Sequence, residues 1–145
     1  MTKPHIGSVS KSLVINDKNE VLILTIGEYK AHPEKSFKPD LPGGMVDAGE
    51  TELAAAVREL QEETGIIVSP DLCTFAYAKT QFFEQKNKSI SRFLYVIYVP
   101  NTPEVTISWE HSSYKWVSLD TLITSVELRP FYKEAVEYCF ANGLI

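Results

Sequence analysis

The sequence predicts a single α/β domain, residues 1–145, in which helices cover a central mixed, mostly antiparallel sheet. Paired aliphatic and aromatic runs are separated by polar turns, and an amphipathic helical pattern interrupts them without regular strand–helix alternation. The chain of 145 residues is 44% hydrophobic and 23% charged, the usual balance of one soluble domain, so a disordered tail or a fibrous rod is excluded.

The strands are expected where β-branched and aromatic residues cluster. These runs are 13–15 and 21–26, which enclose the turn formers 16–19, then 72–83 and 91–99, and the short run 114–117. The first two predict a β-hairpin and the next two a second antiparallel pair. Both alternating sets of 91–99 are apolar, so we expect this strand to be covered on both faces.

The main helix is expected between Thr51 and Thr64. Leu53, Val57 and Leu60 form one apolar stripe at helical spacing. Thr51 suits the N-cap, and Gly65 suits the position that ends a helix. Two further helices are predicted after Ser118 and from Pro130 toward Asn142.

The polar segment 27–40 is longer than most connections in a compact domain. It carries Lys30, Lys35 and Lys38, with Tyr29 and Phe37 interleaved. Such a loop would suit an anionic, aromatic ligand, and a solvated surface loop is the alternative.

Charge and cysteine usage limit the partners and the compartment. Nineteen acidic against fourteen basic residues give a net charge of -5, which disfavours binding to a nucleic-acid polymer. Cys73 and Cys139 lie outside any CxxC spacing and are expected to be reduced, packed thiols. No apolar stretch approaches the ~20 residues that span a bilayer, so we expect a cytoplasmic protein without a membrane partner.

Three carboxylates share one face of the main helix. Glu59, Glu62 and Glu63 lie opposite the apolar stripe, in i, i+3 and i, i+4 arrangements that repel one another. A hard divalent cation would offset this repulsion, since magnesium and manganese prefer oxygen ligands. Arg58 can pair with a carboxylate on the same face.

The spacing of these residues resembles the signature box of the Nudix hydrolases at every fixed position. The box runs from Gly44 to Ile66 and is preceded here by Leu41-Pro42-Gly43. The matching residues are Gly44, Glu50, Arg58-Glu59-Leu60, Glu62-Glu63 and Gly65-Ile66. The resemblance implies a Nudix-type α/β/α sandwich and hydrolysis of a nucleoside diphosphate linked to a further group X.

The resemblance also implies roles for individual residues. Glu62 and Glu63 would be the main metal ligands, joined by the carbonyl of Gly43, for Mg²⁺ or, in its place, Mn²⁺. Glu59 would be a ligand or the general base that activates water, and Arg58 would orient it. Glu50 is expected to hold the loop by hydrogen bonding rather than to contact substrate.

A further acidic group is expected in the segment before Trp116. Glu110 lies where many Nudix relatives place an extra ligand or base on a mobile loop. The alternatives are that Glu110 is a plain exposed residue or that Glu104 takes this role. His111 is expected at the surface rather than as a ligand, since oxygen-liganded metals do not require imidazole.

Substrate choice in this family depends on residues outside the box. The stretch 79–83 has neither the proline associated with ADP-ribose nor the tyrosine associated with diadenosine polyphosphates. Phe82 could stack on a base and Arg92 could contact phosphate, with core packing and a sheet-edge cap as the alternatives. We expect a nucleoside triphosphate or modified nucleotide, split to a monophosphate and pyrophosphate.

Three alternatives stay open: hydrolysis of nucleotide sugars, hydrolysis of dinucleoside polyphosphates, and a non-catalytic nucleotide sensor. The complete box favours an enzyme over a sensor, because a sensor would be free to lose its glutamates. Related proteins are often dimers, and the aromatic strands could supply a homodimer interface.

Overall fold

A seven-stranded mixed sheet forms the middle layer of the structure, a computed structural model that describes residues 2–145. The strands are β1 (His5–Ile15), β2 (Glu20–Ile26), β3 (Pro39–Asp40), β4 (Gly43–Met45), β5 (Cys73–Phe83), β6 (Lys88–Tyr98) and β7 (His111–Ser118). Their order is β3-β2-β1-β6-β5, with β4 paired to β1 and β7 to β2. β1 and β6 run parallel, and the other pairs are antiparallel.

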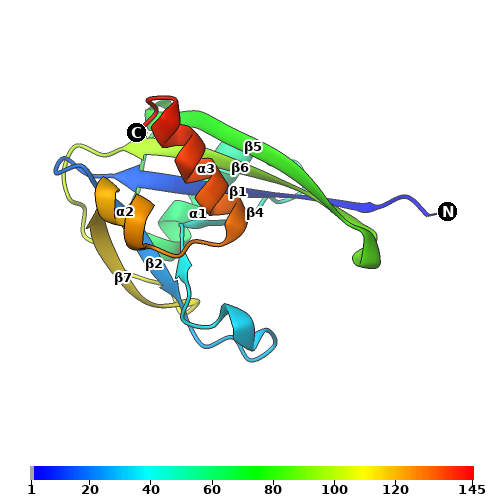
Figure 1. The fold of residues 1–145 in the computed structure, drawn as a ribbon. Coiled ribbons are helices and arrows are strands. Elements are labelled where there is room, and N and C mark those ends of the chain that lie inside the picture. The colour runs from blue at the N-terminus through cyan, green and yellow to red at the C-terminus, as the bar shows by residue number, and fades with distance from the viewer. Residues whose placement is uncertain (1) are drawn as a thin grey trace.

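Helices cover both faces of this sheet (Figure 1). Leu13 and Ile15 of β1 pack with α2 (Leu119–Ser125) and α3 (Pro130–Ala141). Val14, between them, packs on the other side with residues of α1 (Glu52–Thr64). Successive side chains of one strand therefore enter the hydrophobic cores on the two faces of the sheet. The predicted α/β class with a mixed sheet is confirmed.

The two ends of α1 are capped by the residues that the sequence predicts. The Thr51 hydroxyl accepts a hydrogen bond from the Ala54 N–H at 3.0 Å. Gly65 ends the helix in the left-handed region, at φ 76°, and donates its N–H to the Gln61 carbonyl. These caps hold the glutamates of α1 in a fixed position beside β4.

The first strand is longer than the sequence predicts. β1 begins at His5 because it pairs with β6 along its whole length, from His5 opposite Lys88 to Ile15 opposite Tyr98. That partner is distant in the sequence, so local patterning could not reveal it. The loop from 27 to 38 contains only a short 3-10 turn at Pro33–Lys35.

Two smaller expectations concern the thiols and the membrane. Cys73 is partly buried and Cys139 fully buried, and both are free. Among residues 2–145, no helix is long and apolar enough to cross a membrane.

Candidate active site

The site begins where β4 passes between β1 and α1, and two glycines make this passage possible. Gly43 has φ +146°, and a Cβ there would lie 2.1 Å from the Ser10 carbonyl oxygen. A Cβ on Gly44 would lie 2.7 Å from the carboxyl carbon of Glu59. A side chain at position 43 would push β4 away from the backbone of β1, and one at position 44 would displace the Glu59 carboxylate.

Glu63 is the buried carboxylate of the site. Its Oε1 accepts a 2.6 Å hydrogen bond from the Gly43 N–H, and the residue is only 3% exposed. Burial raises the pKa of Glu63 to about 7, although Lys11 and the Gly43 hydrogen bond act in the opposite direction. An additional positive charge nearby would favour its ionised form.

Arg58 ties the other carboxylates to the loop before α1. Its Nε and Nη2 donate to the two Glu50 oxygens at 2.7 and 2.8 Å. Its Nη1 donates to Glu59 at 3.0 Å and to Glu62 at 3.1 Å. Glu50 also accepts from the Asp47 N–H, so it holds the loop as the sequence predicts.

The pKa values around Arg58 follow from these contacts. Hydrogen bonds from Arg58 and from the Asp47 N–H lower the pKa of Glu50 to about 2. Burial raises the pKa of Glu59 despite its contact with Arg58. Glu50 therefore stays ionised over a wide range, whereas Glu59 is the more easily protonated of the two.

The donor set fits a hard divalent cation in its chemistry. Glu59, Glu62, Glu63 and the Gly43 carbonyl all offer oxygen, and Glu63 is buried without full compensation of its charge. Within residues 2–145, however, no three acidic, histidine or cysteine side chains converge on one metal position. Arg58 bonds to Glu59 and Glu62 instead, so a cation has to compete with the guanidinium for these oxygens.

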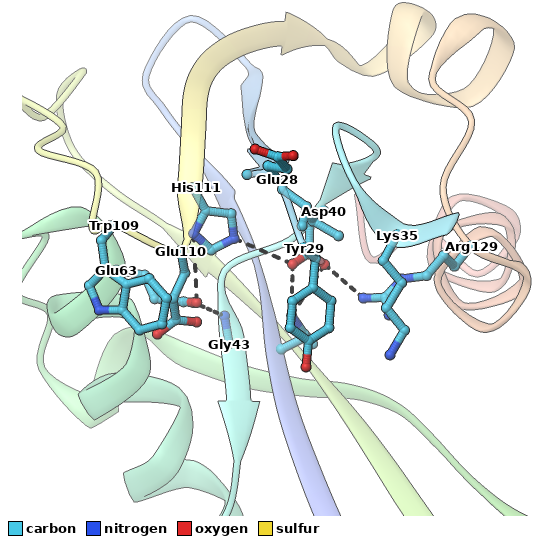
Figure 2. Close-up of a pocket in the computed structure, with 13 residues that line it drawn as sticks. Glu28, Tyr29, Lys35, Asp40, Gly43, Glu63, Trp109, Glu110, His111 and Arg129 are labelled. Atoms are coloured by element: carbon cyan, nitrogen blue, oxygen red, sulfur yellow. Dashed lines mark hydrogen bonds and ion pairs between the residues drawn. The ribbon is translucent and has the colours of Figure 1, made fainter. Parts of the chain in front are cut away.

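A cavity of about 340 Å³ opens beside Glu63. Figure 2 shows Trp109, Glu63 and Glu110 on one side of it, and Lys35 and Arg129 on the other. Glu110 thus lies with Glu63, whereas Glu104 lines a separate hollow with Ile66 and Pro103. Of the two acidic residues considered for the extra role, Glu110 is the one that the fold brings to the site.

The floor of the cavity is a buried ionic network that the sequence reasoning missed. Asp40 accepts hydrogen bonds from Lys11 at 3.2 Å and from Arg129 at 3.0 Å. Burial alone would raise the pKa of Asp40, but Lys11 and the other donors hold it well below its ordinary value. Burial likewise acts to lower the pKa of Lys11, and Asp40 raises it above the ordinary value.

His111 is not a surface residue, which corrects the expectation from the sequence. It begins β7, pairs with Ile26 and is 7% exposed. Its Nε2 lies 3.5 Å from Asp40 Oδ2, and its Nδ1 lies 3.9 Å from Glu63 Oε2. The ring is buried because it lies between Asp40 of β3 and Glu63 of α1, two residues that only the tertiary fold brings beside position 111.

Three residues predicted to bind substrate lie away from this cavity. Lys38 is exposed at the end of the 27–38 loop. Phe82, 54% exposed, lies near the turn between β5 and β6. Arg92 bonds to Gln81 and lines a hollow against α3. Their part in substrate binding stays a prediction, whereas Tyr29 and Lys35 of the same polar loop do line the cavity.

Comparison with known proteins agrees with this arrangement. A model of the NUDIX domain matches residues 8–139. The asymmetrical bis(5'-nucleosyl)-tetraphosphatase of Caenorhabditis elegans is 33% identical over 93 residues, which cover 64% of this chain and 66% of that protein. The 8-oxo-dGTP diphosphatase of Haemophilus influenzae is 47% identical over 58 residues, 40% of each chain.

Solved structures share the whole fold. The MutT protein from Methanosarcina mazei Go1 superimposes with a TM-score of 0.78 at 28% identity, covering 98% of both chains. An Ap4A hydrolase of C. elegans, solved as a binary complex, gives a TM-score of 0.71 at 25% identity, covering 95% of this chain and 97% of that chain.

The glycine loop, the carboxylate helix and the family match define the class of protein: this chain belongs to the Nudix family. Nudix hydrolases generally use divalent metal ions. The matched segments span about half to two thirds of the length of two curated tetraphosphatases, 66% of one and 54% of the other.

Proposed function

We propose that this protein is a Mg²⁺-dependent pyrophosphohydrolase that splits a nucleoside triphosphate, or a modified nucleotide, into a monophosphate and pyrophosphate. Water adds to a phosphorus atom, the anhydride oxygen leaves with pyrophosphate, and the proton of water passes to a carboxylate. The observation that carries the proposal is the placement of the carboxylates of α1: Glu59 lies against Gly44, and Glu63 lies against Gly43. Glu62 belongs to the same helix, and Glu63 lines a cavity large enough for part of a nucleotide.

Different residues of the site would bind the metal, position a carboxylate and accept the proton. Mg²⁺, or Mn²⁺ in its place, would be held by Glu62, Glu63 and the Gly43 carbonyl. When bound, that ion neutralises phosphate charge and makes water a better nucleophile. Arg58 positions Glu59 by its 3.0 Å hydrogen bond. Glu59 or Glu110 accepts the proton, since both carboxylates lie near the site.

A hydrolysis screen tests the proposal. Purified protein is incubated with nucleoside triphosphates, oxidised nucleotides, nucleotide sugars and dinucleoside polyphosphates, with Mg²⁺ or with a chelator. We expect turnover of one class only with metal, and its loss in Glu59→Gln. Glu52→Gln, a change near the start of the same helix, serves as the control and should keep activity. Binding without turnover in the wild type would instead make the protein a sensor.

Dinucleoside polyphosphates are the second candidate class of substrate. The observation that favours them is the 33% identity to the C. elegans tetraphosphatase over 93 residues. The screen separates the two candidates by their products, because a dinucleoside tetraphosphate cut asymmetrically releases a triphosphate rather than pyrophosphate.

A further inference from the structure

The cavity has two chemically different ends. Glu63 and Glu110 lie at one end, where the metal and the phosphates are proposed to bind. Lys35 and Arg129 lie at the other, as Figure 2 shows. Tyr29 lies in the middle of that view, and the centroid of its ring is 5.9 Å from the Lys35 Nζ. A nucleotide that places its phosphates at the carboxylates has its remaining part available for the second end.

Asp40, between the two ends, has no acceptor capacity left for a ligand. Its Oδ1 accepts from Lys11 at 3.2 Å, from the Leu41 N–H at 2.9 Å and from Arg129 at 3.0 Å. Its Oδ2 accepts from Lys11 at 3.2 Å and lies 3.5 Å from His111 Nε2. A carboxylate offers about four lone-pair positions, and these contacts fill them.

Arg129, in contrast, keeps donors free. Its Nη2 donates to Asp40, and its Nε is buried, out of reach of a ligand in the cavity, whereas its Nη1 has no acceptor among residues 2–145. The side chain is 34% exposed, and the ring of Tyr132 lies 5.0 Å from its guanidinium carbon. Asp40 and Tyr132 thus fix the orientation of a guanidinium whose Nη1 hydrogens and second Nη2 hydrogen are left for a pair of acceptors.

We propose that this end of the cavity binds a purine base by its keto edge, with Arg129 as the specificity-determining residue; the inference rests on the proposed nucleotide substrate. Guanine and hypoxanthine place a carbonyl oxygen and a ring nitrogen side by side, and both accept from an arginine fork. Adenine presents an amino group there, whose N–H would face the N–H of Arg129. The site therefore favours keto purines over adenine.

A second phosphate group is the other acceptor that Arg129 could bind. The base is favoured because Tyr29, which is 45% exposed and lines the cavity, offers an aromatic ring beside Lys35. Aromatic side chains provide flat surfaces for stacking on a base. The phosphates, in addition, are required at the carboxylate end, where the metal would bind.

The test compares ITP with ATP, which differ at the 6-keto and 6-amino groups. We measure kcat/KM for both with Mg²⁺, and the affinity for IMP and AMP, which contain no anhydride bond, in the same buffer. We expect a preference for the inosine nucleotides of roughly tenfold, the discrimination typical of one good bidentate contact. Equal values for the two bases, or no binding of either monophosphate, would overturn the proposal.

Variants of Arg129 identify the contact. Arg129→Gln should bring the ITP:ATP and IMP:AMP ratios close to one. Arg129→Lys, which keeps the charge and loses the fork, should do the same. Lys133→Gln removes a charge from the exposed side of α3 and should leave the ratios unchanged. If Arg129→Gln weakens both bases equally, the residue contacts phosphate and the keto-edge assignment is wrong.

The experiments distinguish failure of the proposed hydrolase activity from failure of the proposed base site. Absence of hydrolysis together with an intact preference for IMP over AMP would refute the proposed activity and support the base site. Hydrolysis of ITP and ATP at equal kcat/KM would support the activity and refute the base site.

Discussion

The N–H of Gly43 donates a 2.6 Å hydrogen bond to the carboxylate of Glu63, which joins β4 to the last turn of α1. The bond exists because β4 approaches β1 so closely that position 43 has no room for a side chain. The same approach directs the Gly43 amide toward a carboxylate that is otherwise removed from water. Backbone geometry and the charge of the site are therefore coupled at this pair.

Gly43→Ala should destabilise the protein by more than about 2 kcal/mol and abolish activity. The new Cβ would lie 2.1 Å from the Ser10 carbonyl oxygen, at a φ of +146° that side chains avoid. Urea unfolding measures the loss. The control is Gly49→Ala, where φ is +80° and no atom lies within 4 Å, so the cost should be about 1 kcal/mol. Equal losses would mean that the contact with β1 is unimportant.

Metal affinity should depend on pH through Glu63. A proton and a cation compete for this carboxylate, and its pKa is raised to about 7 by burial. As pH falls from 8 to 6 the ionised form is lost, so Mn²⁺ affinity should weaken roughly tenfold. Calorimetric titration measures the affinity. Glu63→Gln should bind weakly at both pH values, and a wild-type affinity that does not change between them would contradict the assignment.

The fold was predictable from the sequence wherever the determining contacts are local. Thr51 and Gly65 identify the ends of α1, and the two apolar sets of 91–99 indicate a strand covered on both faces, as the two cores confirm. The beginning of β1 at His5 was not predictable, because it depends on parallel pairing with β6. Residues joined by a long-range strand pair carry no mutual signal in a single sequence.

In the candidate site too, the features set by local spacing were predictable and those set by long-range contacts were not. The glutamates of α1 follow from helical spacing, but the network of Asp40, His111 and Arg129 joins three distant segments. One signal for it was present: Lys11 has the same strand parity as Leu13 and Ile15, so it faces the core. A lysine at an inward position requires a buried partner, and Asp40 supplies it.

Arg58→Lys should lower kcat/KM by roughly 10- to 100-fold, the range typical for groups that orient metal ligands. Lysine cannot reproduce the paired bonds to Glu50 together with those to Glu59 and Glu62. Steady-state kinetics with the substrate found in the screen provide the measurement. Asp47→Asn removes only an exposed 3.5 Å contact with Arg58 and should change kcat/KM less than twofold. A similar loss in both variants would argue against a positioning role for Arg58.

Lys11→Met should cost about 3 kcal/mol or more of unfolding free energy at pH 7, since it leaves the buried Asp40 without its main counter-charge. The pKa of Asp40 is held below its ordinary value, so the stabilisation is present above that ordinary value and is lost as pH falls. The difference between wild type and variant, measured by chemical unfolding, should therefore shrink below about pH 4. Lys79→Met is the matched control: its 3.0 Å ion pair with Glu134 is about half exposed, at 52% and 47%, and its loss should cost less than about 1 kcal/mol. If the two variants lose the same stability at pH 7, the buried pair contributes no more than an exposed one.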